Sequence, residues 1–196
     1  MAAFLFPEAK CVLIHIPKNA GASIRRGFFN GKYEGPVQGS IPEEWMQYFR
    51  FTFVRNPYDR LISAWKMFTQ GMEESVWKYP EDGNPNLTLE QFLEIAMDES
   101  IPFDLPKRDK FEVKLRHHAI PQTHPFNCVD QANFIGRFES IERDFKEICD
   151  QLNLSGKLPH WNRTSRTDYR QYFNAATKQT ASEYYAEDLS RFGYEF

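Results

Sequence analysis

The 196-residue sequence lacks an excess of basic residues and a long apolar run. Its formal net charge of −3 argues against a general nucleic-acid or membrane-surface binder, because such proteins carry an excess of Lys and Arg. No stretch approaches the roughly 18 consecutive apolar residues of a membrane-spanning helix, and residues 1–10 lack the basic start and apolar stretch of a secretory signal. We therefore expect a cytoplasmic protein without a membrane span and without a nucleic-acid partner.

Cysteine is also scarce, and the three residues Cys11, Cys128 and Cys149 are odd in number and far apart. This pattern favours buried free thiols in a reducing compartment over a disulfide framework. The five histidines lack the spacing of a metal site, so we expect no bound metal.

Aromatic residues are plentiful, at 16% with 18 Phe, and supply enough buried area for one core. A chain of this length fits a single domain over residues 1–196. Short apolar runs alternate with helical patterns, which predicts an α/β domain with a central, mostly parallel sheet and helices on both sides.

The expected elements are three strands and five helices. The strands are expected at 11–16, 49–54 and 134–136. Helices are expected to begin at Ser23, after the N-cap Asn56, at the capping box of Thr88 and Gln91, near Ile141, and after Asn174, with the last ending near Phe192.

The turn after the first strand has the composition of an anion-binding loop. Lys18 supplies a charge, the small residues 20–22 let backbone amides approach an anion, and Ser23 adds a hydroxyl at the start of a helix. The order differs from the nucleoside-triphosphate P-loop, in which the lysine follows the glycines and adjoins a Mg²⁺-binding hydroxyl. A donor without a magnesium requirement therefore fits better, although an ordinary tight turn is an alternative. We expect His15, at the strand end, to be packed rather than catalytic.

A second strand–turn–helix unit follows. Arg55 ends the strand at 49–54, where ligands bind in open α/β sheets, and Ser63 lies about two turns into the next helix. Arginine can bind a phosphate with two parallel hydrogen bonds, to which a serine adds a third. We expect Arg60 to be a solvated or helix-pairing charge.

These two units, 16–23 and 53–63, resemble the two 3′-phosphoadenosine 5′-phosphosulfate (PAPS) binding loops of the carbohydrate sulfotransferases. The resemblance is to the branch that includes the heparan sulfate 2-O- and chondroitin-type enzymes. Segments 118–122, 135–139 and 185–194 also resemble that branch, so the likeness runs nearly from end to end.

The resemblance implies a P-loop-like sulfotransferase fold and a PAPS-dependent enzyme that releases PAP. It would move a sulfuryl group in line to a hydroxyl of a carbohydrate-like acceptor, which could be anionic. The implied donor-binding residues are Lys18, Asn19, Ala20, Gly21, Ala22 and Ser23 at the 5′-phosphosulfate, Arg55 and Ser63 at the 3′-phosphate, and Arg163, Thr164, Ser165 and Arg166 in a segment that closes over the nucleotide.

Catalysis would use Lys18 against the charge of the leaving group, and a general base on the acceptor. No histidine occurs between Lys18 and Arg55, unlike in the histidine-using members of the family. Glu34, in a loop-like context, is the favoured base, and His118 is its rival. His118 lies in a basic cluster that is read either as a solvated face or as a groove for an anionic glycan, with Lys107, Arg108, Lys110, Lys114, Arg116 and His117.

Two other functions stay open on the sequence. One is a P-loop-like kinase for a small molecule, which would need ATP and Mg²⁺. The other is a non-catalytic nucleotide- or glycan-binding protein descended from sulfotransferases, which the missing histidine would suit.

Overall fold

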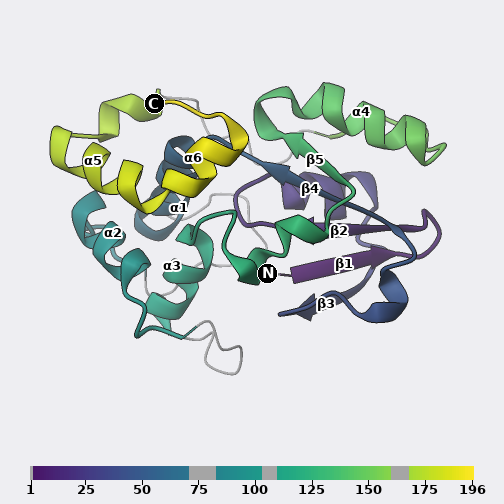
Figure 1. Cartoon of the computed structure of the whole chain (residues 1–196), viewed down its shortest axis with the longest axis horizontal. Helices are drawn as coiled ribbons and strands as arrows, with labels where there is room; N and C mark the ends of the chain where they lie inside the picture. The colour runs from purple at the N-terminus through teal and green to yellow at the C-terminus, as the bar shows by residue number, and fades with distance from the viewer. Residues whose placement is uncertain (1, 71–82, 103–109, 160–167) are drawn as a thin grey trace. The chain divides into compact units, whose positions relative to one another are not determined.

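The computed structural model describes residues 2–70, 83–102, 110–159 and 168–196 (Figure 1). The chain forms two compact units, one from residues 1–55 and 122–163 and the other from 56–121 and 164–196. Each unit therefore combines two separate stretches of the sequence. The expectation of a single domain over residues 1–196 stays a prediction.

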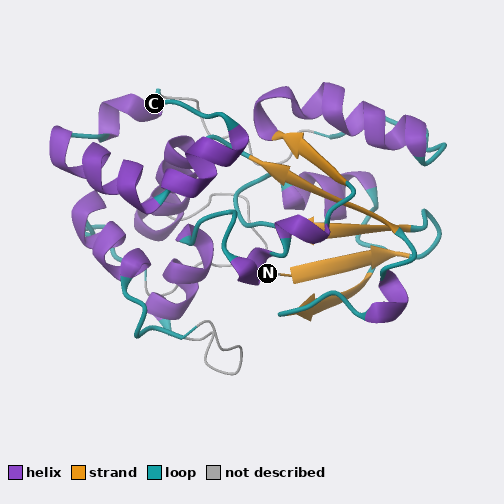
Figure 2. Ribbon diagram, viewed as in Figure 1, coloured by secondary structure: helices purple, strands orange, loops and turns teal. Residues whose placement is uncertain are grey.

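The first unit is built on a five-stranded sheet with the order β3-β1-β2-β4-β5 (Figure 2). The strands are β1 (Ala2–Phe6), β2 (Cys11–His15), β3 (Glu34–Gln38), β4 (Phe49–Val54) and β5 (Phe134–Arg137). The ladders β2–β4 and β4–β5 are parallel, whereas β1 pairs antiparallel with both β2 and β3. Four strands thus run in one direction and β1 runs against them, which confirms the α/β class and the mostly parallel sheet.

Strands β2, β4 and β5 are where the sequence predicts them, but β1 and β3 were not expected. Strand β1 forms a tight hairpin with β2, and Lys10 makes this turn with a φ of 52°. Strand β3 is an edge strand whose first three residues are exposed. Its sequence therefore lacks the alternation of apolar and polar residues that predicts a half-buried strand.

Two layers of side chains cover the sheet. On one face, Phe4, Leu13 and Phe51 pack against Ile24 of the π-helix η1 (Ser23–Phe28) and Phe145 of α4 (Ile141–Gln151). The opposite face packs against Ile41 and against Trp45 of η2 (Glu43–Trp45), with Cys128 close by. The turns on either side of β5 are formed by η4 (Pro125–Asn127), η5 (Val129–Gln131) and η6 (Phe138–Ser140).

The second unit is helical. Its elements are α1 (Pro57–Gln70), α2 (Leu89–Met97), α3 (Phe111–Ala119), η7 (Tyr169–Tyr172), α5 (Ala175–Tyr184) and α6 (Ala186–Phe192). The predicted caps are confirmed: Asn56 Oδ1 accepts a hydrogen bond from the Tyr58 amide, and Thr88 and Gln91 form a capping box. None of the described helices is both long and apolar enough to cross a lipid bilayer.

The expected last helix is divided into α5 and α6 at Tyr185. The Tyr185 side chain is fully buried, and its hydroxyl donates to the carbonyl of Ala119 at 2.6 Å. This anchor joins residues 66 positions apart in the sequence, which local pattern does not reveal.

The expectation for Arg60 is wrong. The residue is only 1% exposed, and its guanidinium donates to the carbonyls of Ile120 at 2.8 Å and His118 at 3.1 Å. Carbonyls at the end of a helix have no partner within it, and α3 ends at Ala119. Arg60 therefore caps the end of α3 from inside the second unit.

We expect Arg60→Met to lower the free energy of unfolding by roughly 2–4 kcal/mol, since it leaves two carbonyls without their donor. Chemical denaturation followed by circular dichroism measures this loss. Arg191→Met is the control, because Arg191 is exposed on α6, and it should cost less than about 1 kcal/mol. Equal losses in the two variants would contradict the capping role of Arg60.

Asp144 at the start of α4 predicts an acid-dependent contribution to stability. Burial alone would raise the pKa of its carboxyl, but hydrogen bonds from the Arg137 amide, Arg143 and Ser140 bring the pKa below its ordinary value of 3.8. Because the folded pKa is lowered, the stabilisation is present above the unfolded pKa and is lost as the pH falls through the folded value.

Asp144→Asn should therefore be less stable than the unmodified chain at neutral pH, and this difference in stability should shrink as the pH falls below about 4, toward the lowered pKa of Asp144. Denaturant titrations across this range measure the difference. Asp150→Asn is the control, because its carboxylate is exposed in a pair with Lys146 and should make little difference. If the difference in unfolding free energy between Asp144→Asn and the unmodified chain does not change with pH, the ionised Asp144 carboxylate does not provide this stabilisation.

Candidate functional site

The loop after β2 has a backbone suited to binding an anion. Lys18 and Ala20 have positive φ angles, of 72° and 63°, while Asn19 and Gly21 between and after them do not. Such alternation turns successive backbone N–H groups toward one side, as in the nests that bind phosphates. Left-handed φ is unfavourable for residues other than glycine, so the surrounding structure must hold this shape.

Gly21 is required by the close approach of His15. A Cβ atom added at Gly21 would overlap the imidazole ring of His15, so only glycine fits. The ring of His15 also packs edge-on against Phe4, with ring centres 6.0 Å apart. The expectation of a packed His15 is therefore confirmed, and its ring supports the loop from the η1 face of the sheet.

A buried pair of amide side chains joins this loop to the end of β4. Asn19 is 3% exposed, and its Nδ2 donates to the Phe53 carbonyl at 2.6 Å and to Gln122 Oε1 at 2.8 Å. Gln122 Oε1 also accepts from the Arg55 amide at 2.9 Å, and Gln122 Nε2 donates to the Arg55 carbonyl at 2.9 Å. Gln122 thus clamps both backbone groups of Arg55.

Sequence reasoning gave Gln122 no role, and it placed Asn19 among the residues that bind the donor. The structure instead directs the amide nitrogen of Asn19 into the protein. Asn19 Oδ1 is buried and has no hydrogen-bond partner among the described residues. The sequence pointed to Gln122 only through the segment 118–122, which resembles the sulfotransferases. Its hydrogen bonds to Arg55 are a tertiary contact that the sequence pattern does not contain.

Arg55 contacts the Lys18 loop. Its Nη1 donates to the Lys18 carbonyl at 3.1 Å, and its guanidinium carbon lies 4.2 Å from the centre of the Phe138 ring. Phe138 follows β5 directly, and the Asp144 carboxylate holds the amide of the preceding residue, Arg137. Three neighbouring parallel strands therefore place Lys18, Arg55 and Phe138 at their carboxyl ends.

The favoured base, Glu34, is not brought to this loop. Glu34 begins β3 and pairs with Leu5, which pairs with Val12, whereas Lys18 lies beyond His15 at the other end of β2. The offset from Val12 to His15 is about 10 Å along the strand, before the lateral spacing of two strands is added. The loop-like context predicted for Glu34 is wrong, and its place in the register excludes direct proton transfer near Lys18.

The other predicted residues lie in the second unit or outside the described part of the chain. Ser63 is half-buried on α1. His118 is half-buried near the end of α3, where its Nδ1 lies 2.8 Å from the Lys114 carbonyl and its ring packs edge-on against Phe68. The segment Arg163, Thr164, Ser165 and Arg166, and the residues Lys107 and Arg108, fall outside the described residues.

The basic cluster is not one exposed face. Arg116 is 8% exposed, and its Nη1 donates to the Ile101 carbonyl. Arg116 is therefore part of the packing of the second unit, and the predicted groove for an anionic glycan loses one of its cations. Among the described residues, no three His, Cys, Asp or Glu side chains gather as a metal site would require.

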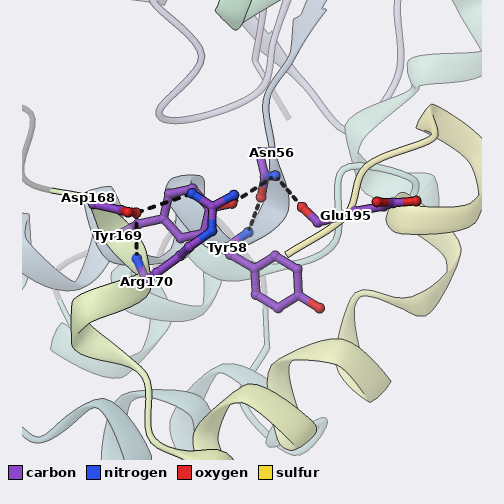
Figure 3. A network of polar contacts seen from close by, with 6 residues as sticks. All are labelled: Asn56, Tyr58, Asp168, Tyr169, Arg170 and Glu195. Atoms are coloured by element: carbon purple, nitrogen blue, oxygen red, sulfur yellow. Dashed lines mark hydrogen bonds and ion pairs between the residues drawn. The ribbon is translucent and has the colours of Figure 1, made fainter.

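The start of α1 is tied to two later segments of the second unit (Figure 3). Asn56 Nδ2 donates to the Glu195 carbonyl at 2.8 Å and lies 3.4 Å from the Tyr169 hydroxyl, while its Oδ1 caps α1. Asp168 caps η7 through the Arg170 amide at 3.0 Å. Asn56 therefore joins the start of α1 to η7 and to the C-terminal segment of the second unit.

Comparison with known proteins matches the chain to sulfotransferases. A sequence model described as "Sulfotransferase family" matches residues 2–195. Carbohydrate sulfotransferase 11 of Mus musculus is 26% identical over 231 aligned positions, which cover 95% of this chain and 65% of the mouse protein, and the Rattus norvegicus protein gives the same values. Carbohydrate sulfotransferase 14 of Homo sapiens is 26% identical over 117 positions, which cover 53% of this chain and 28% of the human protein.

The chain spans slightly less than two thirds of the length of the mouse and rat relatives. No solved structure matches the chain significantly. The family match nevertheless extends over almost every residue, including both strand–turn–helix units and the Gln122 clamp. The chain belongs to the sulfotransferase family.

Proposed function

We propose that the chain is an enzyme that transfers the sulfuryl group of PAPS to a hydroxyl of a carbohydrate acceptor. Membership of the sulfotransferase family and the names of the mouse, rat and human relatives support this reaction class. The observation that carries the proposal is the hydrogen-bonded link from Asn19 through Gln122 to Arg55, which holds the Lys18 loop beside Arg55. Assignment to the heparan sulfate 2-O- and chondroitin-type branch and a cytoplasmic location stay predictions.

The residues of the first unit fit a donor with two anionic groups. The side chains at 20–22 are small or absent, so backbone N–H groups of the loop and the charge of Lys18 would bind the 5′-phosphosulfate. The guanidinium of Arg55 is oriented by the Lys18 carbonyl and the Phe138 ring, and would bind the 3′-phosphate. Ser63 stays a predicted ligand of the 3′-phosphate, and residues 163–166, which lie outside the described residues, stay predicted ligands of the donor.

The proposed step exchanges one sulfur–oxygen bond for another. The acceptor oxygen bonds to sulfur as the bond from sulfur to the bridging phosphate oxygen breaks, and the acceptor proton passes to a base. Lys18 and the loop amides would stabilise the negative charge that develops on the leaving PAP. Such transfers depend mainly on in-line positioning and on preorganised charge, which a clamped loop provides.

With Glu34 excluded by its position, His118 is the remaining candidate for the general base. Its Nδ1 lies 2.8 Å from the Lys114 carbonyl, and an imidazole can take up a proton near neutral pH. The pH dependence of kcat in His118→Gln tests this role. Loss of the acidic limb of the profile would support it, and an unchanged profile would exclude it.

We expect PAP to raise the melting temperature of the chain. A ligand present at 100 times its dissociation constant adds about 2.7 kcal/mol, which is several degrees for a chain of this size. Arg55→Ala should abolish most of the rise, since it removes the proposed 3′-phosphate ligand. Arg143→Ala is a matched control, because its guanidinium is largely exposed on α4, and it should keep the rise.

Parallel titrations with ATP plus Mg²⁺ and with AMP separate the alternatives. A melting temperature that rises only with ATP and Mg²⁺ would indicate a small-molecule kinase. No rise with any nucleotide would contradict a PAPS-dependent enzyme and would favour a non-catalytic binding protein.

Lys18→Ala should lower kcat by on the order of 10²–10³, because it removes a preorganised charge from the leaving group. Its effect on PAP affinity should be much smaller, since the loop amides and Arg55 remain. Stopped assays of sulfate transfer to a carbohydrate acceptor, together with the PAP titration, measure both quantities. An unchanged kcat would remove Lys18 from the mechanism.

A further inference from the structure

The first unit contains a cavity of about 900 Å³ that the proposed donor site does not use. Its wall is formed by the turn between β1 and β2, the end of η1, the start of β3 and the segment after α4. Ligand sites in proteins typically have volumes of about 300–1,000 Å³ and combine aromatic walls with a few polar groups. This cavity has the same size and the same mixture of lining residues.

Aromatic rings line the cavity and are fixed by packing. Phe29 stacks on the buried Phe6 with ring centres 3.8 Å apart and an interplanar angle of 19°. Phe28 packs edge-on against Phe29 and Phe145, at 5.0 Å and 4.8 Å. Phe28, Phe29 and Tyr33 all line the cavity and are only partly buried, so part of each ring remains accessible.

Gly156 brings the backbone of the segment after α4 against these rings. Its φ is 140°, and a Cβ atom there would lie 2.9 Å from Cε2 of Phe28. A glycine at this position therefore serves a close approach that both its conformation and its contact require. The two neighbouring lining residues, Ser155 and Lys157, are exposed at the rim.

The exposed polar residues at the rim of the cavity have formal charges that sum to zero. They carry two carboxylates, two ammonium groups, an amide and a hydroxyl, from Glu8, Glu34, Lys32, Lys157, Asn30 and Ser155. Within the described part of the chain, these six side chains make no hydrogen bond or ion pair with one another or with other residues. Two positive and two negative charges do not favour a polyanion, which would need a basic excess.

A neutral saccharide matches both parts of this lining. The C–H groups on the face of a sugar ring are drawn to the negative face of an aromatic ring, and its hydroxyls pair with amide, ammonium and carboxylate groups. A purely apolar ligand would leave the polar rim unused. A nucleotide would bring negative charge to a rim with no net charge.

The strand register places this cavity at the opposite end of the β1–β2 hairpin from the Lys18 loop. The cavity lies at the Phe6–Cys11 end of the β1–β2 hairpin, and Lys18 follows the Ala2–His15 end. Four residue steps of strand, about 13 Å, lie between the two ends. The helix η1 connects them, because its first residue, Ser23, belongs to the donor loop and its last residue, Phe28, belongs to the cavity wall.

We propose that this cavity is an accessory binding site for a neutral saccharide segment of the carbohydrate acceptor. The inference rests on the proposed function for the nature of the acceptor, but the binding itself needs no donor. It also gives Glu34 a different role from the one expected, as a hydrogen-bond acceptor at the rim rather than a general base.

The test is a titration of the isotopically labelled chain, without nucleotide, with cellotetraose, maltotetraose and chitotetraose. We expect at least one of them to bind saturably in the millimolar range and to shift the backbone amide signals of Asn30, Lys32 and Ser155. Ser155→Trp would fill the cavity from its exposed rim and should weaken binding at least tenfold. Gln151→Trp, at the exposed end of α4 outside the cavity, is the matched control and should bind within twofold of the unmodified chain.

The outcomes separate this inference from the proposed function. Circular dichroism and the melting temperature show whether each variant folds, and Lys157→Trp is a second blocking variant if Ser155→Trp does not. No shift with any of the three probes, shifts only at the Lys18 loop, or equal binding by the blocking and control variants would overturn the saccharide site. A chain that binds PAP but no saccharide refutes only the saccharide site, and the reverse result refutes only the proposed function.

Discussion

The side chain of Gln122 is the contact on which the candidate site depends. It satisfies the amide and the carbonyl of Arg55 and, through Asn19, reaches the loop after β2. The side chains of Gln122 and Asn19 are buried, and an unmade hydrogen bond of a buried group costs about 1–3 kcal/mol. The loop is therefore held in a conformation that includes two positive φ angles outside glycine, and this conformation turns its N–H groups toward one side.

The sheet decides which side chains can act together. Parallel strands β2, β4 and β5 place their carboxyl ends at the same edge, so Lys18, Arg55 and Phe138 meet although 120 positions separate the first from the last. Strand β3 runs in the same direction as β2, because β1 pairs antiparallel with both, so the start of β3 lies at the opposite edge from these carboxyl ends. Glu34 begins β3 and is therefore far from the Lys18 loop, even though it is only 16 residues from Lys18 in the sequence.

Each unit also uses buried polar groups to complete its helix and strand ends. Arg60 caps α3, the Tyr185 hydroxyl binds the Ala119 carbonyl, and Asp144 holds the Arg137 amide after β5. In each case a side chain satisfies a backbone group that secondary structure leaves unpaired. This pattern explains why charged residues that look like surface residues in the sequence are buried in the structure.

The sequence by itself determined the α/β class, strands β2, β4 and β5, the caps at Asn56 and Thr88, and the two strand–turn–helix units that carry Lys18 and Arg55. These features are set by local signals: apolar runs, capping spacing, and the order of small, basic and hydroxyl residues. The tertiary structure alone decided the pairing of β1 and β3, the burial of Arg60, the division of α5 from α6, the clamp at Gln122 and the place of Glu34. All of these depend on contacts between residues far apart in the chain, whose energies the local pattern does not contain.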